Sequence, residues 1–272
     1  MSFHPFRSDP VAVAPLASVA DERAEEAEDY YRHLSAVYAL AENNPRVFAS
    51  PLGPFDYADR HVWLPRFAFF GPNADDTSWR LAFFAGFDAA DLRASRALLG
   101  FLEFLALHAE EGHGLNLAFF PLVDVAGHLF RMPPRRLGQE RWSQSTAPEL
   151  RVLEKNARQN GYHGFVRVET AAHEEDTLVV RVCAPAIEAT EPDVELISSF
   201  EVEPFAVRWE RGAAAPDAGP LTITDDLPVA PFELTLLVPP SWPDELYRRA
   251  VAVVLSKFVL RYRAFQAFGG QL

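Results

Sequence analysis

Two carboxylates three residues apart, Asp88 and Asp91, follow an apolar run and a glycine turn in the segment 81–91. Reactive groups of α/β proteins gather beyond the carboxyl ends of strands, where such a turn would place both side chains. Paired carboxylates can hold a divalent cation or exchange a proton, and Asp also favours the first position of a helix. The sequence leaves all three roles open.

A basic loop is the second feature with chemical potential. It carries Arg131, Arg135, Arg136 and Arg141 in a chain of net charge −13. These arginines could recognise a small anionic ligand or an acidic peptide end, or they could pair with nearby acids as a solvated loop. Trp142, next to the loop, could flank a ligand, although packing is the commoner role of tryptophan.

The elements that would position these residues follow the hydrophobic pattern. Strands are expected at 61–70, interrupted by Pro65, and at 79–87, 115–121, 164–169, 177–183 and 232–238. Helices are expected at 21–41, 88–112, 148–160 and 244–268, with a further helix around 194–200. This alternation predicts a three-layer α/β/α fold, with a mainly parallel mixed sheet flanked by helices.

Length and composition set the remaining limits. We expect an extended arm over 1–22 and one α/β domain over 23–272, since 49% hydrophobic residues can fill a large core. The acidic balance argues against nucleic acid and anionic membranes. The single cysteine, Cys183, excludes an internal disulfide and a thiolate zinc cluster, and no apolar run approaches a membrane span. A cytoplasmic protein is expected, and a homo-oligomer is compatible with the sequence.

Five segments together resemble the zinc carboxypeptidase-like superfamily, in the branch of succinylglutamate desuccinylase and aspartoacylase. They are Phe83–Asp91, Phe120–Gly127, Arg136–Glu154, His163–Glu169 and Phe232–Pro239. The first resembles the turn that carries the family's His-x-x-Glu motif, and the third its Asp-Leu-Asn-Arg segment with the helix after it. The resemblance implies the three-layer fold predicted above and a zinc-dependent peptidase or deacylase ancestry.

At the metal-ligand and general-base positions, the residues of this chain differ from those of the family. It places the family's metal ligands at Asp88, Asp91 and Glu169, and its general base at Leu237. Zinc favours imidazole nitrogen, whereas three carboxylates suit a hard cation such as Mg²⁺ or Ca²⁺. Leucine accepts no proton. We therefore expect no cofactor and no zinc, with a hard divalent cation as the alternative.

The substrate clamp is also changed. The family's Asn-Arg pair falls on Gly138 and Gln139, and glutamine lacks the charged, bidentate grip of arginine. Gln139, Arg131 and Arg136 remain as candidates for contacting a ligand. A register shift would bring His173 to the third ligand position, but its polar surroundings favour an exposed histidine.

Three hypotheses follow. The first is a catalytically inactive carboxypeptidase-like protein whose cleft binds an unknown small anionic ligand or peptide end. The second is a metal-dependent amide or peptide hydrolase that uses Asp88, Asp91 and Glu169 with a hard divalent cation, and the third is a structural role with a filled cleft. Repulsion among the three carboxylates could be relieved by Arg93 or Arg167, which would count against the hydrolase.

Overall fold

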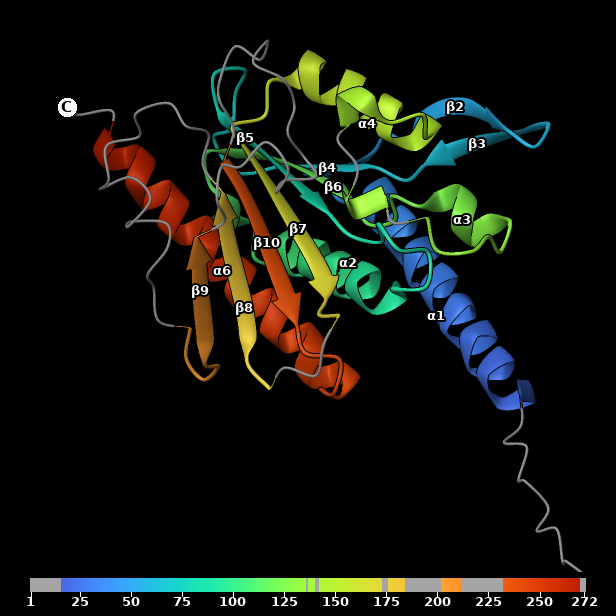
Figure 1. Cartoon of the computed structure of the whole chain (residues 1–272). Helices are drawn as coiled ribbons and strands as arrows, with labels where there is room; N and C mark the ends of the chain where they lie inside the picture. Colours follow the sequence, from blue (N-terminus) through green and yellow to red (C-terminus); the bar gives the residue numbers. More distant parts are fainter. Residues whose placement is uncertain are drawn as a thin grey trace, which may run out of the picture.

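The central feature of the fold is one mixed sheet with helices on both faces. A computed structural model describes residues 16–135, 137–139, 142–172, 176–183, 202–211 and 232–269. Within them, eight strands run in the order β1-β4-β6-β5-β7-β10-β8-β9 (Figure 1). Their bounds are Val47–Ala49, Phe67–Phe70, Leu115–Phe120, Trp79–Phe84, Gly164–Thr170, Phe232–Val238, Leu178–Cys183 and Val207–Arg211, in that order. The three-layer α/β/α prediction is confirmed.

The four central strands, β6, β5, β7 and β10, are parallel to one another, so their carboxyl ends meet at one edge. β4 and β1 continue the sheet antiparallel on one side, and β8 pairs antiparallel with β10 on the other. A separate two-stranded sheet pairs β2 (Leu52–Tyr57) with β3 (Arg60–Leu64). Pro65 divides the expected strand 61–70 between these two sheets, because proline cannot supply a ladder N–H.

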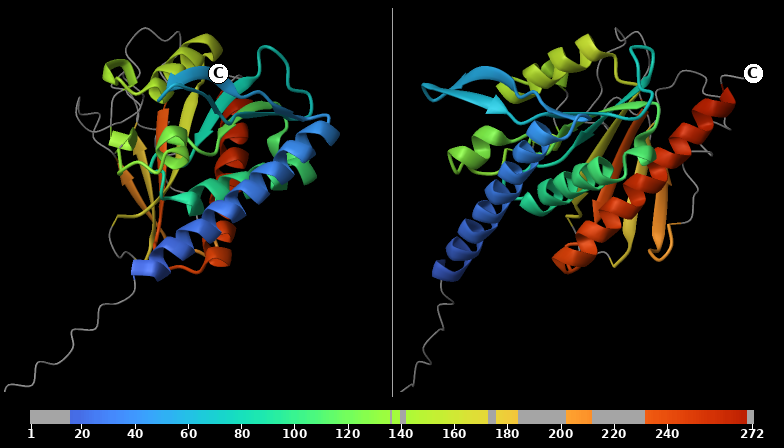
Figure 2. Two further views of the ribbon diagram at one scale, coloured as in Figure 1. Left: turned by 90° about the vertical axis from the view of Figure 1, so that its right-hand side faces the viewer. Right: turned by 180° about the vertical axis from the view of Figure 1, so that it is seen from behind.

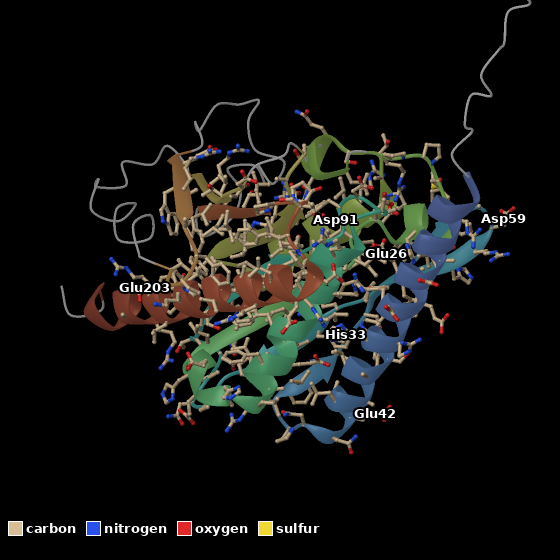
Figure 3. The ribbon with its side chains drawn as sticks, turned by 90° about the horizontal axis from the view of Figure 1, so that it is seen from below. Glu26, His33, Glu42, Asp59, Asp91 and Glu203 are labelled. Atoms are coloured by element: carbon tan, nitrogen blue, oxygen red, sulfur yellow. The ribbon has the colours of Figure 1, made fainter. Side chains whose placement is uncertain are left out.

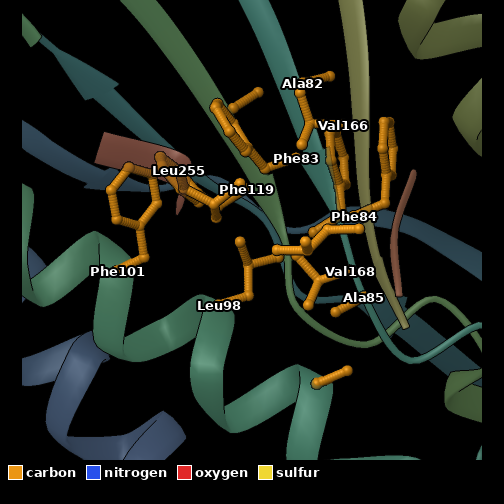
Figure 4. Close-up of a cluster of buried hydrophobic side chains, with 14 of the residues drawn as sticks. Ala82, Phe83, Phe84, Ala85, Leu98, Phe101, Phe119, Val166, Val168 and Leu255 are labelled. Atoms are coloured by element: carbon orange, nitrogen blue, oxygen red, sulfur yellow. The ribbon is translucent and has the colours of Figure 1, made fainter. Parts of the chain in front are cut away.

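Three helices cover one face of the sheet: α1 (Leu16–Asn43), α2 (Leu92–Leu107) and α6 (Asp244–Gly269) (Figure 2). Phe83, Phe119 and Val166 meet Leu98 and Phe101 of α2 in the buried core (Figure 4). The other face carries α4 (Pro148–Asn160) and two short 3₁₀ helices, η2 (Leu137–Gln139) and η3 (Trp142–Gln144). Trp142 packs edge-on against Phe84 and Phe165 there. None of the described helices is long and apolar enough to cross a membrane.

Several boundaries differ from expectation. α1 begins at Leu16, inside the expected extended arm, because Pro15 immediately precedes an alanine- and glutamate-rich run with high helix propensity. The expected helix 88–112 is divided into α2 and the 3₁₀ helix Ala109–Gly112. α4 has the predicted bounds, and Gly161 ends it at φ 57°. The expected helix around 194–200 lies outside the described residues.

A buried group of charges fixes the loop between β6 and α4. Asp124 caps α3 (Val125–Leu129) by accepting from the Gly127 N–H at 2.8 Å. Arg135 pairs with both Asp124 and Glu149, and neither carboxylate is exposed to solvent. Arg135, predicted as part of a ligand-facing loop, thus holds the chain before η2 against the start of α4.

Replacing Arg135 tests this role. Arg135→Met should lower the free energy of unfolding by about 3–5 kcal/mol, because two buried carboxylates would lose their counter-charge. Arg32→Met is the matched control, since Arg32 pairs with Glu28 and Asp29 on the exposed side of α1 and its loss should cost less than about 1 kcal/mol. Denaturant unfolding measures both, and equal losses would contradict a structural role for the buried group.

Candidate functional site

Asp91 is committed to local structure. It is the N-cap of α2, and its Oδ1 accepts from the Ala94 N–H at 3.3 Å. The hydroxyl of Thr170 donates to the same oxygen at 2.8 Å, and the Thr170 N–H donates to Oδ2 at 2.8 Å. Burial raises the pKa of Asp91, partly offset by the hydrogen bonds from Thr170. Both oxygens thus join the start of α2 to the end of β7, which bears out a helix-capping role.

Asp88 faces solvent rather than a shared centre. Its side chain is exposed, and its Oδ1 accepts from the Ala90 N–H at 2.9 Å, two residues ahead. This local bond shapes the turn after β5 and is a common use of aspartate. Figure 3 shows Asp91 among packed side chains, whereas Asp59 and Glu203 lie at the periphery of the molecule.

Glu169 forms an ion pair with Arg167 on the same strand. Residues two apart on a strand share a face, so β7 itself brings the two side chains together. The Arg167 side chain is 4% exposed, and its guanidinium lies over the ring of Phe87 at 4.3 Å from the centroid. Arg167, one of the two arginines expected to relieve the carboxylates, is therefore a fixed internal cation. Arg93, the other, binds Asp244 instead.

Gly138, on η2, packs directly against this ion pair. A Cβ at Gly138 would meet Arg167 Nη2 at 2.5 Å, Glu169 Oε1 at 3.2 Å and Phe87 Cβ at 3.3 Å. The position of the family's substrate-binding asparagine thus packs against the Arg167–Glu169 pair. A side chain at this position would require the Arg167 guanidinium or η2 to move.

Of the other residues predicted to contact a ligand, the structure describes Gln139 and Arg131 but not Arg136. Gln139 lies on η2 beside Gly138, and Arg131 is exposed with a φ of 50°. Arg136, Arg141 and His173 lie outside the described residues. Whether Gln139, Arg131 and Arg136 contact a ligand remains a prediction.

Leu237 lies where the resemblance expects the general base. It is directly opposite Glu169 in the parallel pairing of β10 with β7. The third ligand position and the base position are thus neighbours across two strands, and one carries an ion-paired glutamate while the other carries a half-buried leucine.

The donor set does not fit a catalytic metal. Asp91 uses both oxygens in hydrogen bonds, Glu169 neutralises Arg167, and Asp88 is exposed in its turn. A divalent cation at Glu169 would lie against a guanidinium, which repels it. Nowhere in the described ranges do three or more His, Cys, Asp or Glu side chains form a group that could hold a metal ion.

The sequence located the turn and named Arg167 as one of two arginines that could pair with the carboxylates. Strand periodicity places Arg167 and Glu169, two residues apart, on one face, and the structure pairs these two. Thr170, which occupies both oxygens of Asp91, gave no comparable signal because its contact spans 79 residues of sequence.

The same face of the sheet holds a second carboxylate, Glu233 on β10. It lies opposite Phe165 of β7 and Cys183 of β8 in the backbone register. Burial raises the pKa of Glu233 to about 7, opposed by attraction to Arg167. Arg181 of β8 faces the same side but pairs with Glu210 of β9 at 3.0 Å.

Gly138→Ala tests the close packing over the ion pair. The added methyl group should displace Arg167 or η2 and lower the free energy of unfolding by about 1–3 kcal/mol. Gly100→Ala is the control, because a Cβ there meets nothing within 4 Å and alanine favours the helix, so stability should rise by up to about 1 kcal/mol. Chemical denaturation compares the two, and a neutral Gly138→Ala would contradict the packing.

Glu233 makes stability depend on pH. Its pKa in the folded protein exceeds the unfolded value, so the wild type should lose stability relative to Glu233→Gln as pH rises from about 4.5 to 7. At pH 8 the variant should be more stable by about 2–3 kcal/mol, and at pH 4 the two should be nearly equal. Denaturant unfolding at both values, with the exposed Glu203→Gln as control, measures it. A difference independent of pH would contradict the effect of burial.

Comparison with known proteins gives similarity at the level of structure. No family model and no curated protein sequence matches the chain. A metallo-carboxypeptidase from Burkholderia cenocepacia has a TM-score of 0.66 at 17% identity, over 86% of this chain and 69% of that one. A Pseudomonas aeruginosa metallo-carboxypeptidase in complex with (2-guanidinoethylmercapto)succinic acid gives 0.60 at 12%, over 83% and 67%. Thrombin activatable fibrinolysis inhibitor gives 0.58 at 11%, over 85% and 73%. The chain therefore has the metallo-carboxypeptidase fold.

Proposed function

We propose that this chain is a non-catalytic protein of the metallo-carboxypeptidase fold. The observation that carries the proposal is the Arg167–Glu169 ion pair, which stands at the third metal-ligand position implied by the resemblance. A guanidinium is a permanent cation that no change in metal supply removes. The protein's own side chain thus supplies a positive charge beside the position where the resembled family binds zinc.

The loss extends beyond the metal position. Leu237 cannot take a proton from water, and Gly138 supplies no side chain to a substrate. General-base catalysis needs a titratable group within hydrogen-bond reach of the proton it removes. Arg167, Gly138 and Leu237 belong to three different elements, so restoring the reaction would take coordinated changes on β7, η2 and β10.

The proposal keeps a role in binding. Arg131 is exposed and, among the described residues, makes no ion pair, so its charge is free for a carboxylate or a peptide end. Gln139 and Arg136 are near it in sequence and complete the expected ligand-contacting set. The same proposal places the chain near the desuccinylase–aspartoacylase branch, as the sequence resemblance implies. It also places the protein in the cytoplasm, as its composition suggests.

A hard-cation hydrolase is the alternative. It requires Asp88, Asp91 and Glu169 to turn free oxygens toward one point, as the ligands of Mg²⁺ or Ca²⁺ do. Asp91 is fully engaged by Thr170 and Ala94, and Glu169 is engaged by Arg167. The geometry therefore favours the non-catalytic protein.

Metal analysis combined with activity assays tests the proposal. Purified protein, incubated with excess Zn²⁺ or Mg²⁺ and then dialysed, should retain less than about one tenth of an equivalent of either metal. Hydrolysis of C-terminal peptide bonds and of N-acyl amino acids should equal the rate of a heat-denatured sample. One equivalent of metal together with hydrolysis that a chelator abolishes would overturn the proposal.

A further inference from the structure

The amino ends of β5 and β7 are joined by two hydrogen bonds between Arg80 and His163. The backbone N–H of His163 donates to the Arg80 carbonyl at 2.8 Å, and the backbone N–H of Arg80 donates to Nδ1 of the His163 ring at 3.1 Å. The paired register of the two strands begins one residue later, with Leu81 opposite Gly164. A side-chain nitrogen therefore supplies one of the acceptors that hold the start of β5 to the residue before β7.

Aromatic packing and a third strand surround the His163 ring. Its centroid lies 4.1 Å from that of the partly exposed Trp79 ring, and Trp79 meets Tyr262 of α6 edge-on at 6.1 Å. The backbone N–H of Phe232, at the start of β10, donates to the His163 carbonyl at 3.3 Å. The starts of β5, β7 and β10 thus meet at this residue, at the amino edge of the sheet.

The hydrogen bond from Arg80 determines which nitrogen of the His163 ring carries the proton. Nδ1 accepts an N–H, so the neutral ring has its proton on Nε2. An imidazolium has a proton on both nitrogens, and its Nδ1–H would point at the Arg80 N–H. Two donors cannot form one hydrogen bond, so the contact between Nδ1 and the Arg80 N–H requires a neutral ring.

The charge nearest the ring also opposes its protonation. Burial lowers the pKa of His163, and the positive charge of Arg80 acts in the same direction. The Arg80 guanidinium donates to the backbone carbonyls of Asn160 and Asp76 at 2.7 and 2.9 Å. These acceptors are neutral, so they hold the guanidinium in place without cancelling its charge.

The other elements around the ring bring uncharged side chains. The loop before β7 contributes Tyr162, α6 contributes Tyr262, and β10 contributes Phe232. Phenol groups carry no charge at neutral or acidic pH. The indole of Trp79 attracts a cation, and it can still do so after the His163 ring has turned away from Arg80. The protonated ring therefore has a second position available beside Trp79.

We propose that His163 is a pH-sensitive switch, in which protonation turns Nδ1 away from Arg80 and separates the start of β5 from the start of β7. The switch lies at the opposite end of β7 from the Arg167–Glu169 pair. It uses no metal and no hydrolysis, so it does not depend on whether the chain is catalytic.

The direction of the pH effect follows from the lowered pKa of His163 in the folded chain. The contact contributes its full stability above about pH 6.5, the ordinary pKa of histidine. That contribution is lost as the pH falls from this value through the pKa of His163 in the folded chain. The effect is opposite in sign to that of Glu233, whose folded pKa is raised.

Hydrogen exchange of the Arg80 amide, measured by NMR on the full chain, tests the switch. Below about pH 6.5 its protection factor should fall by up to about tenfold per pH unit, because opening takes up one proton. In His163→Asn the side-chain carbonyl can accept the same N–H but cannot titrate, so protection should not depend on pH. His61→Asn is the control, since the His61 side chain is 76% exposed and pairs with Asp56 on the separate hairpin. This control should keep the pH dependence of the wild type.

Nitrogen-15 NMR of the His163 ring in the wild type gives a second readout that needs no variant. At pH 8, Nε2 should carry the proton and Nδ1 should be unprotonated. A proton on Nδ1 at pH 8 would overturn the proposal. Equal protection of the Arg80 amide at pH 7.5 and pH 5 in the wild type would also overturn it, as would an equal fall in His163→Asn.

Far-ultraviolet circular dichroism checks that each variant is folded, and His163→Gln, which also offers a carbonyl acceptor, replaces His163→Asn if that variant does not fold. Glu233 is present in every protein compared, so its effect on stability is the same in each. Metal content and hydrolysis play no part in these readouts, and their outcome is distinct from that of the metal test.

Discussion

A buried arginine must have a counter-charge, and in this protein that requirement determines how the side chains pack at the carboxyl end of β7. Arg167 lies in the middle strand layer, over the ring of Phe87, with Glu169 as its ion-pair partner. Removing Glu169 would leave the buried Arg167 without its counter-charge, which costs about 3–5 kcal/mol. The turn after β5, the end of β7 and η2 all pack around this pair, so its geometry determines what that edge of the sheet can do.

The remaining elements hold the pair in place. Asp91 connects the start of α2 to Thr170, the residue after Glu169. Arg135, which pairs with the buried Asp124 and Glu149, anchors the chain three residues before Gly138. Asp91 caps a helix, and Arg135 closes a loop. The chain thus has the fold of a metallo-carboxypeptidase, and the side chains at this edge of its sheet bind one another.

Hydrophobic periodicity predicted the three-layer fold and several boundaries. The bounds of α4 were predictable because Pro148 begins the helix and Gly161 ends it, and those of β10 because it is a continuous, mainly apolar run. The pattern failed at β1 and β9, which are short, and at β2, where Gly53 and Pro54 interrupt the run. The turn that carries Asp88 and Asp91 follows β5, as predicted. Its ion pair follows from strand alternation, whereas the contact between Asp91 and Thr170 depends on tertiary packing that periodicity does not encode.

Anomalous diffraction from crystals soaked in zinc tests the central claim most directly, since it shows atoms and metal together. We expect no zinc peak among Asp88, Asp91 and Glu169, and the Arg167 guanidinium should remain against Glu169 and over Phe87. A zinc peak bound by these carboxylates, with Arg167 displaced from Glu169, would contradict the account.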